Sequence, residues 1–351
     1  MTKRITIADV AERAGVGKVT VSYVLNGRAD EMRISSQTQE RILAAAKELD
    51  YRPNGVARML SRKQSDIVAV IFQDPNYFSL GSTFLNEVLH GVCRECVEQK
   101  LDLMLHTRPS ENVFDEANAL SDGRIDGLLA LRDEDDATLR ALIRRKFPLV
   151  LFFSRPLDPD IAYVDCDNYT GGKIAAQHLL SLGHKRLGMV VGPQKSVDSA
   201  DRYQGFASVV QAAGHSIDPA HIVPFNSPKA SAEDFAALLK KKDRPTAFFV
   251  WSDDVAFECM KVAKGMGLRL PEDLSLVGFD STPACDLVEP KLTSIRQPVE
   301  DMARAATRIL AAIIREEEGE ATHLVFPPQL VVRASTAAPS DARHSIQEDI
   351  I

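Results

Sequence analysis

Seven short apolar runs between residues 67 and 280 constrain the fold more than any other feature of this chain. They are IVAVIF (67–72), LDLMLH (101–106), IDGLLAL (125–131), FPLVLFF (147–153), RLGMVVG (186–192), TAFFVW (246–251) and LSLVGFD (274–280). Segments with helical patterning separate most of them. This alternation is typical of parallel sheets covered by helices on both faces. Seven or more strands in a chain of this length favour two α/β lobes over one.

The first 65 residues differ from the rest in charge. They contain 12 basic and 7 acidic residues, whereas the remainder contains 30 basic and 42 acidic residues. A compact basic segment on an acidic body is typical of a nucleic-acid-binding domain joined to a second domain. A solvated basic surface without a partner is the alternative.

Composition favours a cytoplasmic protein that does not enter a membrane. No apolar run reaches the ~18 residues of a membrane span, and the N-terminus lacks the apolar region and cleavage site of a signal peptide. The cysteines are odd in number and scattered, which indicates reduced thiols. They are Cys93, Cys96, Cys166, Cys259 and Cys285.

The N-terminal segment predicts two helices joined by a short turn. Thr6 is a candidate N-cap, and Gly15 suits the left-handed end of the first helix. Its predicted buried stripe is Ile7, Val10, Ala11 and Ala14. On a helical wheel, VGKVTVSYVLNG separates into an inner and an outer face. The inner face holds Thr20, Val21, Val24 and Leu25, and the outer face holds Lys18, Val19, Ser22, Tyr23 and Asn26.

A third helix follows a polar loop, GRADEMRI. Ser35 or Ser36 is its candidate N-cap, and its predicted inner face is Ile42, Leu43, Ala46 and Leu49. Helix, Gly-containing turn and helix form a helix-turn-helix, whose second helix enters the major groove of DNA. A small helical bundle without a special function is the alternative.

The stretches TIADVAERAGVGKVTVSYVLNG and QERILAAAKELDYRPNGVARMLSRKQS resemble the headpiece of the lactose-repressor (LacI/GalR) family of bacterial transcription regulators. The resemblance implies that Lys18, Val19 and Tyr23 read bases. This chain departs from the family pattern at Gly17, where Ser is usual, at Tyr23, where Arg is frequent, and in a longer loop before the third helix. The candidate DNA contacts are Thr6, Lys18, Val19, Thr20, Ser22, Tyr23, Asn26, Asn54, Ala57, Arg58 and Leu60.

Residues 53–65 form a candidate hinge. Pro53 and Gly55 discourage a rigid helix, yet Val56, Ala57 and Leu60 share a helical face. A marginal amphipathic helix of this kind folds when DNA supplies the missing contacts. The resemblance implies that two hinge helices pair in a dimer over the minor groove and insert Leu60 between bases. A plain flexible linker is the alternative.

The body resembles the periplasmic-binding-protein-type core of the same family, through VDCDNYTGGKIAAQHLLSLGHKRLGMV and LPEDLSLVGFD. The expected fold class is α/β: an all-α helix-turn-helix headpiece plus a two-lobed core of parallel sheets flanked by helices. We expect the headpiece at 1–52, the hinge at 53–65, the core at 66–338 and a tail at 339–351. The first lobe would span about 66–160 and 291–323, and the second about 161–290 and 324–338.

Open α/β sheets bind ligands beyond the carboxyl ends of their strands. That rule selects the candidate effector contacts Tyr77, Phe78, Phe153, Ser252, Asp253 and Asp280. Two further candidates are Arg202, which precedes a predicted helix, and Phe225, which follows the run HIVPF. An arginine, carboxylates and aromatic rings suit a polyol or a heterocycle. The resemblance implies effector contacts at Arg202, Asp253 and Asp280, although a loop aspartate is more often a cap. Phe153 and Ser154 stand where many sugar-responsive relatives have Asp, which argues against a usual sugar effector.

No enzyme, metal or cofactor signature emerges. Cys93 and Cys96 form C-x-x-C within a predicted helix, where packed thiols are the expected state. A dinucleotide fingerprint and a phosphate loop are absent. We therefore expect a homodimeric regulator, most often a repressor in this family, that binds near-palindromic double-stranded DNA and a small-molecule effector. The rivals are a solute-binding protein and a sugar- or nucleoside-processing enzyme. The tail lacks leucine heptads, so we expect no tetramer.

Overall fold

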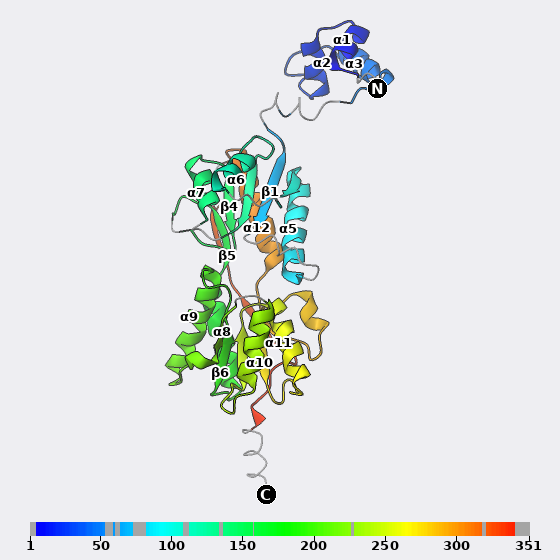
Figure 1. Cartoon of the computed structure of the whole chain (residues 1–351). Helices are drawn as coiled ribbons and strands as arrows, with labels where there is room; N and C mark the ends of the chain where they lie inside the picture. Colours follow the sequence, from blue (N-terminus) through cyan, green and yellow to red (C-terminus); the bar gives the residue numbers. More distant parts are fainter. Residues whose placement is uncertain are drawn as a thin grey trace. The chain divides into compact units, whose positions relative to one another are not determined.

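The computed structural model describes residues 5–52, 59, 64–72, 82–107, 112–132, 136–156, 158–225, 228–317 and 321–340. The chain divides into two units, Met1–Ser65 and Asp66–Ile351, each with its own core (Figure 1). None of the helices in these ranges is long and apolar enough to cross a membrane.

The first unit is a three-helix headpiece made of α1 (Ile7–Ala14), α2 (Lys18–Leu25) and α3 (Ser36–Glu48). Gly15 ends α1 with φ 65°, a left-handed conformation that glycine adopts without strain. Ser35 caps α3 by accepting a hydrogen bond from the Thr38 N–H. The fully or nearly buried core of the headpiece is Val10, Ala11, Ala14, Val21, Val24, Ala29, Ile42, Ala45 and Ala46.

One predicted core position of α3 is wrong. Leu43 is 52% exposed, whereas Ala45 is buried. The buried stripe of α3 follows Ile42, Ala45 and Ala46, which lie three and four residues apart, and Leu43 lies about 100° away from Ile42 around the helix.

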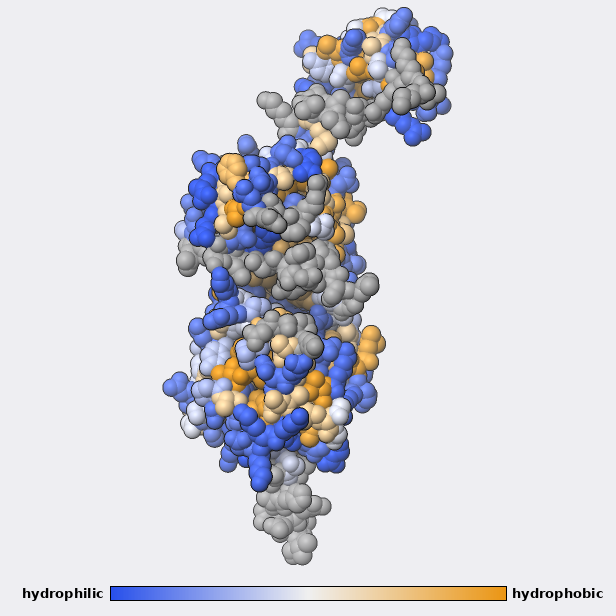
Figure 2. Space-filling model, viewed as in Figure 1, coloured by the Kyte–Doolittle hydropathy of each residue, from blue (hydrophilic) through white to orange (hydrophobic). Residues whose placement is uncertain are grey.

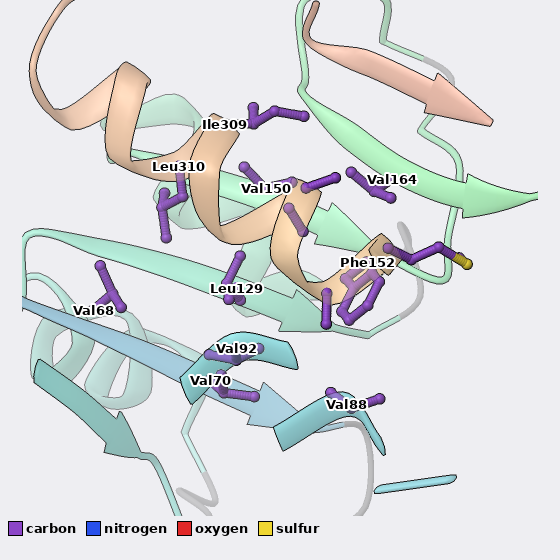
Figure 3. Packing of buried hydrophobic residues seen from close by; sticks show 14 of the residues in the cluster. Val68, Val70, Val88, Val92, Leu129, Val150, Phe152, Val164, Ile309 and Leu310 are labelled. Atoms are coloured by element: carbon purple, nitrogen blue, oxygen red, sulfur yellow. The ribbon is translucent and has the colours of Figure 1, made fainter. Parts of the chain in front are cut away.

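The first lobe of the core is built on a parallel six-stranded sheet of order β11-β5-β4-β3-β1-β2. The strands are β1 (Ile67–Phe72), β2 (Asp102–Leu105), β3 (Gly127–Leu131), β4 (Leu149–Phe152), β5 (Tyr163–Cys166) and β11 (His323–Phe326). Helices α5 (Thr83–Gln99) and α12 (Val299–Ile314) cover one face, and α6 (Val113–Leu120) and α7 (Ala137–Arg144) cover the other. Figure 3 shows Ile309 and Leu310 of α12 lying over Val150 and Leu129 of the sheet.

The second lobe repeats this architecture with the sheet order β12-β10-β9-β8-β6-β7. The strands are β6 (Leu187–Val190), β7 (Ile222–Val223), β8 (Ala247–Val250), β9 (Ser275–Asp280), β10 (Thr293–Arg296) and β12 (Gln329–Val331). Helices α8 (Asn168–Ser181) and α9 (Val197–Ala212) cover one face, and α10 (Pro228–Leu239) and α11 (Asp253–Gly265) cover the other.

The seven apolar runs are all strands, β1, β2, β3, β4, β6, β8 and β9, so the predicted parallel α/β architecture is confirmed. β12 alone is antiparallel to its neighbour among the described strands. The expected crossings near residues 160, 290 and 323 each lie a few residues too early. β5 still pairs with β4 in the first sheet, β10 pairs with β9 in the second, and β11 pairs with β5, so the chain crosses after these strands.

Helices α8 and α9 approach each other closely enough to require glycine. A Cβ atom on Gly172 would overlap the carbonyl oxygen of Arg202, and one on Gly205 would overlap the carbonyl oxygen of Tyr169. The two helix backbones are therefore in direct contact. This contact fixes where α9 places the Arg202 side chain.

Candidate functional site: a reading helix and a cluster at the strand ends

Arg202 lies within α9 (Val197–Ala212) and not before a helix, as its place in the sequence suggested, and its side chain is buried. Its Nε donates to Asn168 Oδ1 at 2.8 Å, and its Nη1 donates to the carbonyl oxygen of Trp251 at 2.5 Å. Its Cζ lies 3.5 Å from the centre of the Phe279 ring. The guanidinium is thus fixed at the point where α8, α9 and the ends of β8 and β9 meet.

Asp280 lies at the end of β9 with φ 109°, a strained conformation for an aspartate. Its Oδ1 accepts a hydrogen bond from Gln297 Nε2 at 2.6 Å. Burial and the nearby Asp253 carboxyl raise the pKa of Asp280 well above its usual value, while Arg202 acts in the opposite direction. Asp280 and Arg202 therefore belong to one electrostatic cluster.

Asp253 faces the protein interior. It is fully buried and accepts hydrogen bonds from the Ser294 hydroxyl (2.6 Å), the Thr282 N–H (2.9 Å) and the Cys285 thiol (3.0 Å). These contacts join α11 to β10 and to the segment after β9. They favour a structural role for Asp253 over the effector contact that its position in the sequence suggested.

Ser252 also has a local role, because its Oγ accepts the Val255 N–H as the N-cap of α11. Tyr77 and Phe78 lie outside the described residues.

Aromatic side chains lie at the strand ends of both lobes. Phe153 follows β4 with φ 57°, which is unusual for a bulky residue, and its ring lies 4.0 Å from Phe152 and 4.8 Å from Phe84. In the second lobe, Phe225 lies 5.8 Å from Trp251. Phe153 and Phe225 therefore belong to separate aromatic groups, one in each lobe.

Three neutral polar atoms in this region are buried without a hydrogen-bond partner among the described residues. They are Ser154 Oγ after β4, Trp251 Nε1 after β8 and Gln297 Oε1 after β10. Buried polar groups are normally satisfied, so these atoms are candidates for contacts with a ligand. The strand-end rule could have identified Trp251, but the β10 segment did not stand out in the sequence and Gln297 was missed.

An ionic network joins the two lobes beside this cluster. Arg155, after β4, pairs with Asp165 at the end of β5 (3.1 Å) and with Asp201 on α9. Asn168 donates to Asp165 Oδ1 (3.1 Å) and also receives the Arg202 bond. Burial raises the pKa of Asp165 despite these partners.

A second contact between the lobes joins Thr83 of the first lobe to Asp254 of the second, with the Thr83 hydroxyl donating to Asp254 Oδ1 at 3.1 Å. Sequence reasoning identified neither Arg155 nor Asn168.

The electrostatics of Asp280 predict a pH effect. Because the pKa of Asp280 is higher in the folded state than in the unfolded state, ionisation of its carboxyl lowers the free energy of unfolding. This loss begins as the pH rises above 3.8, the usual aspartate value, and grows toward the folded-state pKa. We expect Asp280→Asn to become progressively more stable than the wild type between pH 5 and 8. Urea unfolding midpoints across this range would measure the difference.

Asp273→Asn is the matched control, because the pKa of Asp273 is shifted in the opposite direction to that of Asp280. Arg269 lowers the pKa of Asp273 to about 2, so this ion pair is complete throughout that pH range. Its loss should therefore cost the same free energy at every pH tested. A pH-independent difference for Asp280→Asn would contradict the assignment.

The headpiece presents an outward face on α2. Val19 is 64% exposed and Lys18 is exposed, while Val21 and Val24 of the same helix are buried. Ser22 Oγ accepts from Asn26 Nδ2 at 3.2 Å, and Tyr23 is half-buried. Figure 2 shows hydrophilic residues over much of the viewed headpiece surface with apolar ones among them. The predicted inner positions Val21 and Val24 and the predicted outer positions Lys18 and Val19 are therefore confirmed. The other predicted positions of the two faces, inner and outer alike, are half-buried.

The other candidate DNA contacts differ in accessibility. Thr6 is exposed, and its backbone N–H and hydroxyl both donate to Asp9 Oδ2 at the start of α1 (2.7 and 2.6 Å). Thr20 is half-buried. The hinge candidates Asn54, Ala57, Arg58 and Leu60 lie outside the described residues.

Comparison with known proteins places both units in one family. Residues 6–54 match the model of bacterial regulatory proteins of the lacI family, and residues 176–336 match a periplasmic binding protein-like domain. The transcriptional regulator CelR of Thermobifida fusca is 32% identical over 341 residues, which cover 95% of this chain and 98% of CelR. The chain belongs to the lacI family.

Other members of the lacI family support the same assignment. The transcriptional repressor PurR of Photobacterium profundum is 30% identical over 335 residues, covering 94% of this chain and 98% of PurR. A solved complex of CelR with cellobiose has a TM-score of 0.72 and 31% identity, with 95% of this chain and 100% of that chain covered. A lac repressor dimer bound to operator and the anti-inducer ONPF has a TM-score of 0.81 at 25% identity, with 96% and 100% covered.

Proposed function

We propose that this lacI-family protein is a homodimeric transcriptional repressor whose affinity for a near-palindromic operator changes when a small-molecule effector binds to its core. The exposure of Val19 is the observation that most supports this proposal. This large aliphatic side chain on α2 is 64% exposed and lies outside the headpiece core, where it is free to contact a thymine methyl group in the major groove.

The reading surface that we propose consists of Lys18, Val19, Ser22, Tyr23 and Asn26 on α2. Thr6 and Thr20 would support it, and Asn54, Ala57, Arg58 and Leu60 would act from the hinge. Two copies related by a two-fold axis would read the two halves of the operator. A regulator of this kind would act on the chromosome, in the bacterial cytoplasm.

We propose a neutral sugar as the effector, held in part by Ser154 and not by the aspartate that many sugar-responsive relatives have at this place. The unpartnered atoms of Ser154, Trp251 and Gln297 are neutral donors and acceptors, and Trp251 and Phe225 offer an apolar platform for a sugar ring. Arg155 is paired with two carboxylates, Asp165 and Asp201, so this network has no surplus positive charge, which disfavours an anionic ligand. The complex of the similar CelR with cellobiose supports this class, and a purine-like heterocycle is the second candidate.

We infer that the protein is not an enzyme. Among the described residues, the titratable side chains at the strand ends are held by protein partners in a network that suits ligand control rather than catalysis. Effector and DNA would influence each other's binding by the same factor. The experiment that tests this is binding-site selection from random double-stranded DNA with the full-length protein, followed by titration of candidate effectors.

We expect one enriched near-palindrome and a change in its affinity with one neutral sugar. The same sugar at 100 times its Kd should stabilise the protein by about 2.7 kcal/mol in thermal unfolding. Turnover of that sugar would support the enzyme alternative. No enriched sequence, with or without sugars and at low and moderate salt, would contradict the proposal.

Tyr23→Ala tests the reading face. We expect the variant to lose preference at one base pair in each half of the operator, with discrimination falling by ~1–3 kcal/mol. Binding to a set of single-base operator variants would measure this. Equal weakening on every sequence would show instead that Tyr23 contacts phosphate or supports packing.

A further inference from the structure

The loop after α2 is held firmly against the headpiece. The Arg28 N–H donates to the carbonyl oxygen of Tyr23 at 2.9 Å, and the Ile34 N–H donates to the carbonyl oxygen of Ala29 at 2.9 Å. Ala29 itself is buried in the headpiece core. The backbone at Arg28 therefore has a defined position relative to α2, although its side chain is exposed.

The Arg28 side chain lies against the residue that we expect to read a base. Its Cζ is 5.6 Å from the centre of the Tyr23 ring, within the range of a cation–π contact. Its Nε donates to Glu31 Oε2 at 2.8 Å. The two terminal nitrogens, Nη1 and Nη2, have no protein partner within the described ranges. The guanidinium is thus oriented by two contacts while its terminal N–H groups remain available.

The chemistry of the two side chains is complementary. A tyrosine offers one hydroxyl, which cannot distinguish guanine through two parallel hydrogen bonds. A guanidinium can donate to both O6 and N7 of guanine, the commonest specific contact in the major groove. Because Tyr23 and Glu31 already restrict the Arg28 rotamers, less conformational entropy is lost when those bonds form.

We propose that Arg28 is a base-reading residue, which Tyr23 supports from α2 and which recognises one guanine in each half of the operator. This inference rests on the proposed DNA-binding function. Tyr23 then acts partly as a platform, so removing either member of the pair affects the same base pair. Glu31 holds the guanidinium in the free protein and, being anionic, opposes binding to any DNA.

Arg33 provides a matched control within the same loop. It is also an exposed arginine, at φ 54°, but it has no ring contact in the described part of the headpiece. If Arg28 contributes only positive charge, Arg28→Ala and Arg33→Ala should lower the affinity for DNA alike. If Arg28 reads a base, only Arg28→Ala should lower the discrimination between bases.

The experiment uses the full-length protein and the operator obtained by selection. Affinities for that operator and for every single-base variant would be measured by fluorescence anisotropy at two salt concentrations. For Arg28→Ala we expect discrimination at one guanine in each half-site to fall about tenfold or more, with other positions unchanged. Arg28→Lys, which keeps the charge but not the fork, should lose the same discrimination with a smaller loss of affinity.

Three further variants complete the test. Arg33→Ala should weaken all sequences equally or not at all, and Glu31→Gln should raise affinity for all sequences while keeping the preference. The double variant Tyr23→Ala/Arg28→Ala should lose little more discrimination than either single variant. Thermal unfolding of each variant checks that the headpiece remains folded.

Uniform weakening by Arg28→Ala, as for Arg33→Ala, would overturn the inference in favour of a phosphate contact. Unchanged binding would overturn it in favour of a solvated surface pair. In both cases the wild type would still select an operator, so the proposed function would stand. Failure of the wild type to enrich any sequence would overturn the proposed function and this inference together.

Discussion

Gly205→Ala is expected to destabilise the core and to abolish its response to effector. A Cβ at this position would overlap the carbonyl oxygen of Tyr169, which belongs to the backbone of α8 and has no freedom to rotate away. The helices must separate, and overpacking of this kind costs about 1–3 kcal/mol or more. Since Arg202 lies on α9 and reaches Asn168 on α8, the separation would also displace its guanidinium.

Urea unfolding and effector-induced thermal shifts of the full-length protein would measure both effects. Gly265→Ala is the matched control, because this glycine lies in α11 without a positive φ and no atom outside its own helix turn lies within 4 Å of the position that a Cβ would take. We expect that change to be neutral or to stabilise by up to about 1 kcal/mol. If Gly205→Ala behaved like the control, the close approach of α8 and α9 would be wrong.

Val21→Asp is expected to unfold the headpiece and leave the core intact. Val21 is fully buried, and an unpaired carboxylate at that position costs several kcal/mol. A unit of about 60 residues has little stability to lose. Operator binding should fall at least 100-fold, about 2.7 kcal/mol, while the effector should still stabilise the core, which has separate hydrophobic clusters.

Val19→Asp separates folding from recognition. The same carboxylate two residues earlier would be exposed, so the headpiece should keep its thermal transition. Its operator affinity should nevertheless fall, because the charge would face the DNA. Calorimetry of both variants, together with anisotropy, would distinguish them. A headpiece of Val21→Asp that melts like the wild type would contradict the packing described for α2.

The sequence predicted the seven strands that lie within its apolar runs. β1 matches its predicted run because the polar residues Asp66 and Gln73 flank it, and β9 matches closely because it begins at Ser275 and ends at Asp280. β5 (YVDC), β10 (TSIR) and β12 (QLV) are short and contain polar residues, so their patterns do not differ from those of loops. Their pairing depends on neighbours distant in the chain, and so do the positions of the crossings.

The site was predictable to the extent that strand ends determine it. Phe225 and Asp280 lie at or beside the cluster, as their places after predicted strands indicated, whereas Arg202 reaches it from within α9. The direction in which a side chain points was not predictable, because partners far along the chain set it. Asp253 faces inward toward Thr282, Cys285 and Ser294. The contact between Arg28 and Tyr23 likewise depends on a loop conformation that no periodicity describes.

The last two described strands complete both sheets of the core only when the chain is nearly finished. β11 covers the edge of β5 in one sheet, and β12 covers the edge of β10 in the other, within the short stretch from His323 to Val331. A ribosome that stops before His323 would release a chain whose headpiece can fold but whose sheets end at β5 and β10, two strands that β11 and β12 otherwise cover. Open edges recruit other strands. Truncated chains should therefore precipitate and be degraded rather than accumulate as regulators that occupy operators without responding to any signal.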